Sequence, residues 1–232
     1  MSTHHISTQF DAELEAIRTS MLRMGGLVEE QLRDALAGFE TRDLAMLESV
    51  EAKELEVNTL EIDLDDRCTH VIARRQPAAG DLRLVMAVFK TITDLERIGD
   101  ESVKIARAAQ RIQARSSTAP SGFSGMRIAG NIAGGMLKDA LNAFARIDSE
   151  SGGKIVLQDA QMDEEFRRLL RELVTFMLED PTTISTCLDI IWIGKALERI
   201  GDHAKNIAQH VIYIAQGVDV RHRKSIERTR PS

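Results

Sequence analysis

The sequence predicts an all-α protein made of two pseudo-symmetric up-down-up three-helix bundles, with six long helices in all. Three observations favour this fold class. Apolar residues make up 43% of the 232 residues, aromatic residues only 4%, and there are 4 prolines, which is typical of helices packed through aliphatic side chains. Apolar residues recur at steps of three and four. A six-residue segment also occurs twice, which indicates an internal duplication.

The duplicated segment reads Leu-Glu-Arg-Ile-Gly-Asp and occupies residues 95–100 and 197–202. A second match lies upstream and aligns residues 32–43 with residues 137–148. The offset is 102 for the first match (197 − 95) and 105 for the second (137 − 32). The chain is therefore expected to consist of two homologous halves, with a few residues missing from the second copy.

The six helices follow from the apolar periodicity and from the residues that interrupt it. They are expected at about residues 10–39, 43–75, 81–115, 126–147, 151–179 and 183–217. Pro77 ends the second helix because proline cannot continue one, and Asp81 is expected to cap the third. Gly152 and Gly153 weaken the start of the fifth helix. Short connections make consecutive helices antiparallel.

The boundary between the halves is marked by composition. Residues 116–125 are rich in Ser, Gly and Pro, which is typical of a linker. We expect a first bundle at residues 8–115 and a second at residues 126–217. Residues 218–232 form a basic tail that is expected to be disordered.

Composition excludes several classes of protein. The net charge is -6, with 30 basic and 36 acidic residues mixed along the chain, so there is no broad positive field for nucleic acid. The first residues lack the pattern of a signal peptide, and no apolar run approaches the ~20 residues of a membrane span. Cys68 and Cys187 form no Cys-x-x-Cys pair. We expect a soluble cytoplasmic protein with reduced thiols.

Each copy of the repeat places two carboxylates at the edge of an apolar helical face. Glu96 and Asp100 are four residues apart in the first copy, as are Glu198 and Asp202 in the second, so each pair shares one face of a helix. Burying a lone carboxylate costs several kcal/mol, so these carboxylates are expected to be neutralised, paired with a basic side chain or bound to a cation. The glycine inside each copy costs up to ~1 kcal/mol relative to Ala, which indicates close approach of a helix or ligand.

The second helix of each half carries a matching pair, Asp159 and Asp163 in one half and Glu54 and Asn58 in the other. Antiparallel packing brings each pair toward the repeat and predicts an all-oxygen site for a hard cation such as Fe, Mn, Mg or Ca. The second half is preferred, because Asn58 replaces a carboxylate in the first. Ion pairs with nearby lysines and arginines are the open alternative. The candidate ligands are Glu54, Asn58, Glu96, Asp100, Asp159, Asp163, Glu198 and Asp202.

Other charged residues are weaker candidates. Arg74, Arg75 and Arg83 flank the proline turn and offer a contact to an anion or an acidic partner, although solvated helix ends are the commoner explanation. His203 is turned some 100° around the helix from the acid that precedes it. We expect this histidine at the surface or between helices, and not as a metal ligand.

Three stretches of the chain resemble the PhoU family of bacterial accessory proteins for phosphate-specific transport. They are residues 73–84 (Ala-Arg-Arg-Gln-Pro-Ala-Ala-Gly-Asp-Leu-Arg-Leu), residues 94–100 (Asp-Leu-Glu-Arg-Ile-Gly-Asp) and residues 197–207 (Leu-Glu-Arg-Ile-Gly-Asp-His-Ala-Lys-Asn-Ile). The likeness extends over about residues 8–217. It implies two three-helix bundles in a cytoplasmic homodimer, either free or peripheral at the inner membrane through its partners.

The resemblance also implies a function. Family members restrain phosphate uptake and phosphate-starvation (Pho regulon) signalling, and they link the ATPase subunit of the phosphate ABC transporter to a sensor histidine kinase. Some relatives hold metal clusters through Glu/Asp-x-x-x-Asp pairs. That property carries over to Glu96, Asp100, Glu198 and Asp202, with Asn58 as the departure from the pattern.

The leading hypothesis is thus a non-catalytic adaptor, since no Ser-His-Asp set and no phosphate loop is present in the sequence. The rival is a di-metal bundle enzyme of the oxidase type. Such enzymes use Glu-x-x-His pairs, whereas Glu96 and Glu198 are each followed three residues later by glycine. A structural coiled-coil rod is a third reading, but it gives no reason for acids and glycines within the apolar repeat.

Overall fold

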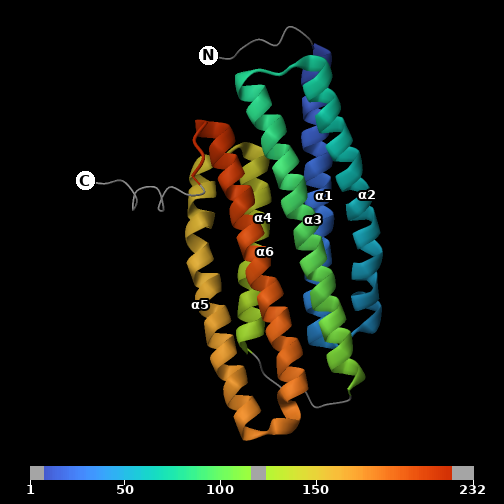
Figure 1. The fold of residues 1–232 in the computed structure, drawn as a ribbon, viewed down its shortest axis with the longest axis vertical. Coiled ribbons are helices and arrows are strands. Elements are labelled where there is room, and N and C mark those ends of the chain that lie inside the picture. The colour runs from blue at the N-terminus through green and yellow to red at the C-terminus, as the bar shows by residue number, and fades with distance from the viewer. Residues whose placement is uncertain (1–7, 116–123, 221–232) are drawn as a thin grey trace, which may run out of the picture.

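The computed structural model describes residues 8–115 and 124–220. These residues form six α-helices, one 3-10 turn and no strand, which confirms the all-α prediction (Figure 1). The elements are α1 (Thr8–Thr41), α2 (Leu44–Arg75), α3 (Ala79–Ala114), α4 (Ser124–Arg146), α5 (Ser149–Glu179), η1 (Pro181–Thr183) and α6 (Ile184–Gln216).

The helices form two three-helix bundles that stand side by side. Helices α1, α2 and α3 pack on one another, and so do α4, α5 and α6. Contacts between the bundles run mainly from α3 to α6, with a smaller contact from α1 to α4 (Figure 1). Both α3 and α6 therefore bury more of their surface than α2 and α5 do. One continuous apolar core extends through both bundles.

The duplication is visible in backbone detail. Asp43 caps α2 by accepting hydrogen bonds from two backbone amides, and Asp148 caps α5 in the same way. The residue before each cap has a left-handed backbone, with φ 58° at Arg42 and φ 52° at Ile147. Since 148 − 43 is 105, these caps obey the offset found in the sequence.

Two helix starts differ from expectation. Asp81 is not the cap of α3, because the helix already begins at Ala79 and places Asp81 in its first turn, where a negative charge suits the helix dipole. Helix α5 begins at Ser149 and continues through both glycines. Gly152 has a packing role there, since an added Cβ would lie 3.0 Å from the Ala208 carbonyl oxygen of α6.

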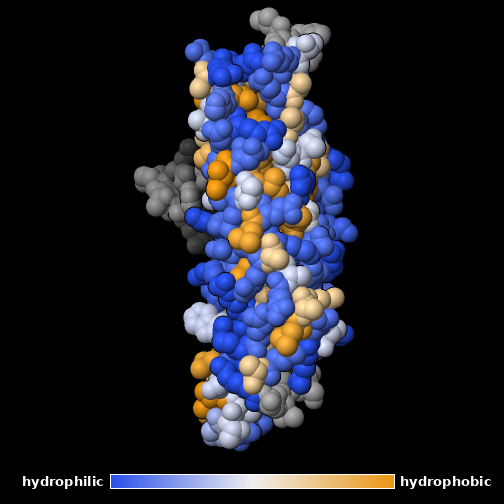
Figure 2. All heavy atoms as spheres, turned by 90° about the vertical axis from the view of Figure 1, so that its right-hand side faces the viewer, coloured by the Kyte–Doolittle hydropathy of each residue, from blue (hydrophilic) through white to orange (hydrophobic). Residues whose placement is uncertain are grey.

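Part of the predicted linker and tail lies outside the described residues, namely 116–123 and 221–232. Helix α4 already begins at Ser124. None of the helices in the described ranges is long and apolar enough to cross a membrane. Seen from the side on which α2 lies, the surface is mostly hydrophilic, and apolar side chains appear there as separate spots (Figure 2).

Candidate functional site

Four carboxylates of the first bundle influence one another between α2 and α3. We call Glu54, Glu61, Glu96 and Asp100 the acidic cluster. Burial raises the pKa of Glu54, and the charges of Asp100 and Glu96 raise it further, although a hydrogen bond from Gln31 opposes them. Burial likewise raises the pKa of Glu61, with added repulsion from Glu96 and other carboxylates. The cluster therefore holds more negative charge than its surroundings stabilise.

Glu54 is packed into the bundle by contacts on three helices. Gln31 Nε2 of α1 donates to Glu54 Oε2 at 2.8 Å and to the Val50 carbonyl oxygen at 3.2 Å. On α3, a Cβ added to Gly99 would lie only 2.7 Å from Glu54 Oε2. Glu54 Oε1 is buried and accepts no hydrogen bond from any described residue. The glycine of the first repeat thus makes room for the carboxylate, and one oxygen of that carboxylate is left unsatisfied.

Lysine and arginine do not neutralise the acidic cluster directly. Within the described ranges, no ion pair joins any of its four carboxylates to a basic side chain. Burial raises the pKa of Glu96 and Asp100 adds to the rise, while Arg97, His203 and Lys104 lower it from a distance.

The second bundle is different, because basic side chains contact its acids. Lys205 Nζ lies 2.7 Å from both Asp159 Oδ2 and Asp202 Oδ1. Burial lowers the pKa of Lys205, but its hydrogen bonds to the two carboxylates outweigh this effect and raise it. Lys195 Nζ lies 2.6 Å from Glu198 Oε2. The fourth predicted ligand, Asp163, is 3.6 Å from the guanidinium of Arg167.

The two bundles differ because the neutralising residues are not duplicated. The position of Lys205 corresponds to Val103 in the first repeat at the offset of 102. Conversely, Gln31 is replaced by Met136 at the offset of 105, and Gly201 faces Met162 Cγ at 3.2 Å from its added Cβ. The charge balance therefore favours the first bundle for a cation, whereas counting carboxylates in the sequence favoured the second.

The donor set of the first bundle fits a hard cation, since it offers carboxylate oxygens, one of them buried without a partner. However, no group of three or more His, Cys, Asp or Glu side chains among the described residues is arranged to hold a metal ion. A cation would have to draw the acids together. In the second bundle, it would also have to displace Lys205.

The three arginines near the Pro77 turn are not brought together. Arg75 forms a two-point ion pair with Glu13 of α1, with distances of 2.6 and 3.0 Å. Arg83 lies against Gly217 at the end of α6. Arg74 is exposed. Arg75 thus ties α2 to α1, and the three side chains do not converge on one anion.

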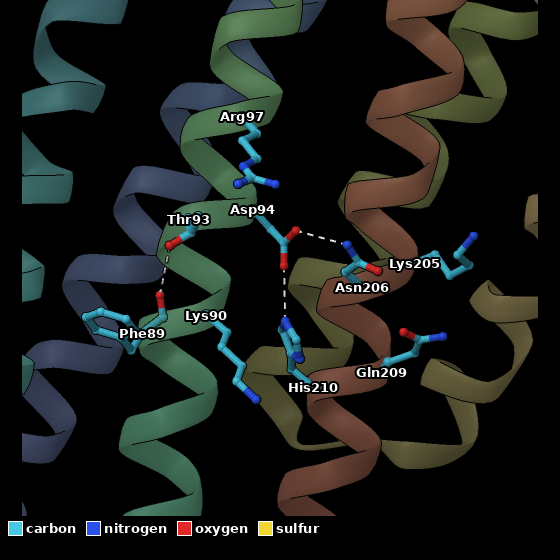
Figure 3. Close-up of a pocket in the computed structure, with 9 residues that line it drawn as sticks. All are labelled: Phe89, Lys90, Thr93, Asp94, Arg97, Lys205, Asn206, Gln209 and His210. Carbon is cyan, nitrogen blue, oxygen red and sulfur yellow. Dashed lines mark hydrogen bonds and ion pairs between the residues drawn. The ribbon is translucent and has the colours of Figure 1, made fainter. Parts of the chain in front are cut away.

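A buried polar centre joins the two bundles, and sequence reasoning did not identify it. Asp94 of α3 is hydrogen-bonded to three side chains of α6, of which Asn206 and His210 are drawn in Figure 3. His203 Nδ1 is 2.8 Å and Asn206 Nδ2 3.1 Å from Asp94 Oδ1, and His210 Nε2 is 3.0 Å from Oδ2. Burial raises the pKa of Asp94, but these hydrogen bonds outweigh it and lower the pKa below its ordinary value.

This centre lies in a cavity of about 480 Å³ between α3 and α6, which Lys90 and Arg97 also line (Figure 3). His203 contacts Asp94 across the two helices, which is one of the two locations expected for it, the surface or a position between helices. The sequence gives only a weak indication of the other residues of this centre. Asp94 directly precedes the repeat, its counterpart is Ala196, and His203 and His210 are seven residues apart on one face of α6.

Comparison with known proteins identifies the family. The family model for the PhoU domain matches residues 21–109 and 126–211, one stretch in each bundle. The chain belongs to the PhoU family. This membership confirms the resemblance seen in the repeated motif.

Full-length relatives in the PhoU family carry a consistent name. A phosphate-specific transport system accessory protein PhoU homolog from Pseudomonas putida is 46% identical over 220 residues, covering 95% of this chain and 86% of the relative. The phosphate-specific transport system accessory protein PhoU of Escherichia coli (strain K12) is 41% identical over 218 residues, covering 94% and 90%.

Solved PhoU structures have the same fold. The crystal structure of PhoU from Pseudomonas aeruginosa matches with a TM-score of 0.87 and 44% identity, covering 90% of this chain and 100% of that one. The phosphate transport system regulatory protein PhoU from Streptococcus pneumoniae matches with a TM-score of 0.83 and 27% identity, covering 91% and 99%. The two-bundle arrangement is therefore shared across distant members of the family.

Proposed function

We propose that this protein is a non-catalytic regulator of phosphate homeostasis. It restrains phosphate uptake and phosphate-starvation signalling by linking the ATPase subunit of the phosphate ABC transporter to a sensor histidine kinase. It acts in the cytoplasm as a homodimer and reaches the inner membrane through these partners. The observation that carries the proposal is the near-complete coverage of relatives named accessory proteins of phosphate-specific transport.

The shape of the molecule supports an adaptor. Six helices of 23 to 36 residues give the molecule an extended surface, which offers area for contact with more than one partner. Two contacts of the duplicated motif hold helices together, since Gly99 packs against Glu54 and Lys205 joins Asp202 to Asp159. They thereby serve the bundle itself, which accords with a role in binding.

Deletion of the gene tests the regulatory role. A strain that lacks the protein should express a phosphate-starvation reporter at high phosphate, and the intact gene should restore repression. Reporter output that stays low in the deletion strain would contradict the proposal. Capture of the transporter ATPase and the kinase on immobilised full-length protein tests the adaptor role directly.

A hard cation such as Fe, Mn, Mg or Ca is proposed at the acidic cluster, where Glu54, Glu61, Glu96 and Asp100 would hold it. Bound there, it would supply positive charge and relieve the repulsion that raises the carboxylate pKa values. Mn²⁺ should then raise the unfolding temperature of the wild type but not of a Glu96→Gln, Asp100→Asn variant. The matched Glu198→Gln, Asp202→Asn variant should keep the response. Equal responses in all three proteins would rule the site out.

A further inference from the structure

One surface groove between α3 and α6 is strongly basic, although the whole chain has a net charge of -6. We call it the basic groove; it has a volume of about 340 Å³. Its lining residues are Glu101, Lys104, Arg107 and Arg111 of α3 and Trp192, Lys195, Ala196 and Arg199 of α6. Five of these are lysine or arginine and one is acidic. A concentration of one charge sign in a concave site focuses the electrostatic potential there.

Buried carboxylates hold three of the five bases of this groove in place, and the other two, Arg107 and Lys195, pair with Glu51 and Glu198. Glu101, with a side chain only 7% exposed, lies 2.9 Å from Lys104 Nζ and 3.1 Å from Arg199 Nη1. At the end of the groove, buried Asp189 accepts hydrogen bonds from Arg111 and from Arg115. Each carboxylate carries one negative charge and contacts two cations. A positive charge is therefore left over at each of these places, on a side chain that is already oriented.

A row of exposed apolar side chains adjoins the groove on α6. Ile184, Leu188 and Trp192 are spaced by four residues and are 41%, 47% and 65% exposed. We call these three residues the apolar ladder. Residues four apart lie on one face of a helix, and Trp192, the only tryptophan of the chain, belongs to both the ladder and the groove. Tryptophan and arginine are the residues that most often dominate the binding energy of protein interfaces.

We propose that the basic groove and the apolar ladder together form a docking surface for an acidic amphipathic helix of a partner protein. The apolar face of that helix covers the ladder, and its carboxylates follow the basic groove. The inference rests on the proposed adaptor function and adds to it the surface and the chemistry of the partner segment.

The extent of the surface favours this occupant. The ladder begins two helical turns before Trp192, so a small anion bound in the groove would leave Ile184 and Leu188 uncovered. A helix of about four turns would reach both parts at once. It would bury three large apolar side chains and pair with bases whose positions are already fixed, which reduces the entropy lost on binding.

A designed peptide tests the surface without assuming a particular partner. The probe is a dye-labelled 18-residue helix with Leu on one face and Glu on the other, titrated with full-length protein while fluorescence anisotropy is recorded. Emission of Trp192 gives a second readout at the surface itself. We expect binding, and we expect a twin peptide with Lys in place of Glu to bind at least about tenfold more weakly.

Two substitutions localise the binding. Arg107→Glu and Trp192→Ala should each weaken the binding of the acidic peptide by about tenfold. Arg107 pairs with exposed Glu51 and is 60% exposed, so its reversal leaves the fold intact. The matched control is Arg23→Glu, since Arg23 is 66% exposed and pairs with Glu56 in the first bundle. Leu55→Ala, at an exposed apolar residue of α2, is the control for Trp192→Ala.

Several results would overturn the inference. These are no binding of the peptide, an equal loss in the control variants, or a groove that retains inorganic phosphate or anionic phospholipid vesicles in preference to the peptide. Self-association abolished by Arg107→Glu would assign the surface to a second copy of the chain instead.

Capture of the two proposed partners distinguishes failure of the proposed function from failure of the docking surface. If wild-type protein retains neither the transporter ATPase nor the kinase, the proposed function fails. If wild type and Arg107→Glu retain both equally well, only the docking surface fails.

Discussion

His210 Nε2 of α6 lies 3.0 Å from Asp94 Oδ2 of α3, and this contact joins the two bundles across a buried interface. His203 and Asn206 are hydrogen-bonded to the other carboxylate oxygen of Asp94, Oδ1. Apolar packing is not directional, whereas a carboxylate whose oxygens both accept hydrogen bonds fixes the position of its donors. The centre therefore adds a directional contact to the apolar packing of α3 on α6.

Replacing Asp94 should destabilise the protein. In Asp94→Ala, the two histidines and Asn206 lose their acceptor inside the interface, which should cost about 2–3 kcal/mol of unfolding free energy. Urea unfolding measures this. Asp66→Ala is the control, because Asp66 contacts His70 in an exposed pair and should cost less than about 0.5 kcal/mol. Equal losses in both variants would show that the buried centre adds nothing.

The same centre predicts a dependence on pH. The folded-state pKa of Asp94 is lowered, so its contribution is fully present above the unfolded value of about 3.9. The contribution is lost as the pH falls through the lower folded value. The ionisation of Asp94 should therefore contribute a constant amount to the difference in unfolding free energy between wild type and Asp94→Ala from about pH 5 upward. In strong acid this contribution should decrease.

Glu54 predicts the opposite dependence. Its pKa is raised in the folded state, so folding favours the protonated form, and stability should rise as the pH falls from 7 through the folded value toward about 4.5. Glu54→Gln removes the charge and brings a donor near the buried, unpartnered Gln31 Oε1. We expect this variant to gain about 0.5–1 kcal/mol at pH 7 and little below pH 4.5.

The exposed Glu48→Gln change on α2 is the control for Glu54. It should leave unfolding free energy within about 0.5 kcal/mol of wild type at both pH values. A loss of stability in Glu54→Gln at pH 7 would mean that a positive charge stabilises the Glu54 carboxylate in the dissolved protein. The charge balance described for the acidic cluster would then be wrong.

Lys205 should contribute more to the unfolding free energy than an ordinary surface lysine does. Lys205→Met leaves Asp159 and Asp202 facing each other without the cation between them, which should cost about 1–2 kcal/mol in thermal or urea unfolding. Lys154→Met removes an exposed pair with Glu150 and should cost less than about 0.5 kcal/mol. A Lys205→Met variant as stable as the control would refute the neutralising role.

Adjacent glycines at the start of α5 should respond in opposite directions to alanine. An alanine Cβ at position 152 would lie 3.0 Å from the Ala208 carbonyl oxygen, a backbone atom that cannot turn aside, so Gly152→Ala should destabilise. Nothing lies within 4 Å of a Cβ at Gly153, so Gly153→Ala should stabilise by about 0.5–1 kcal/mol. Melting temperatures that move in the same direction would contradict the close helix approach.

The fold could be predicted from the sequence because it depends on local patterns. Apolar spacing fixes which helix faces are buried, and Asp148 marks a helix start through its own backbone contacts. The position of Asp81 was misjudged because α3 begins without a side-chain cap, so no cap residue signals its start.

The candidate site was harder to predict because charge balance depends on residues that the repeat does not share. Lys205 lies three residues after the repeated acid Asp202, yet only the packing of α5 on α6 shows that it also reaches Asp159. The Asp94 centre could not be predicted from the sequence for a different reason. Its partners lie more than 100 positions away, and the alignment of one bundle on the other leaves no periodic signal.

The contacts between the bundles pair two helices of the first bundle with their own duplicates, α3 with α6 and α1 with α4. Such a pairing has the form of a two-fold symmetric dimer interface, now enclosed in one polypeptide. Each half covers on the other the face that would be exposed if either half stood alone. The two sides of this interface are nevertheless unlike, because Asp94 of one half corresponds to Ala196 of the other, so the polar centre exists once and breaks the two-fold symmetry.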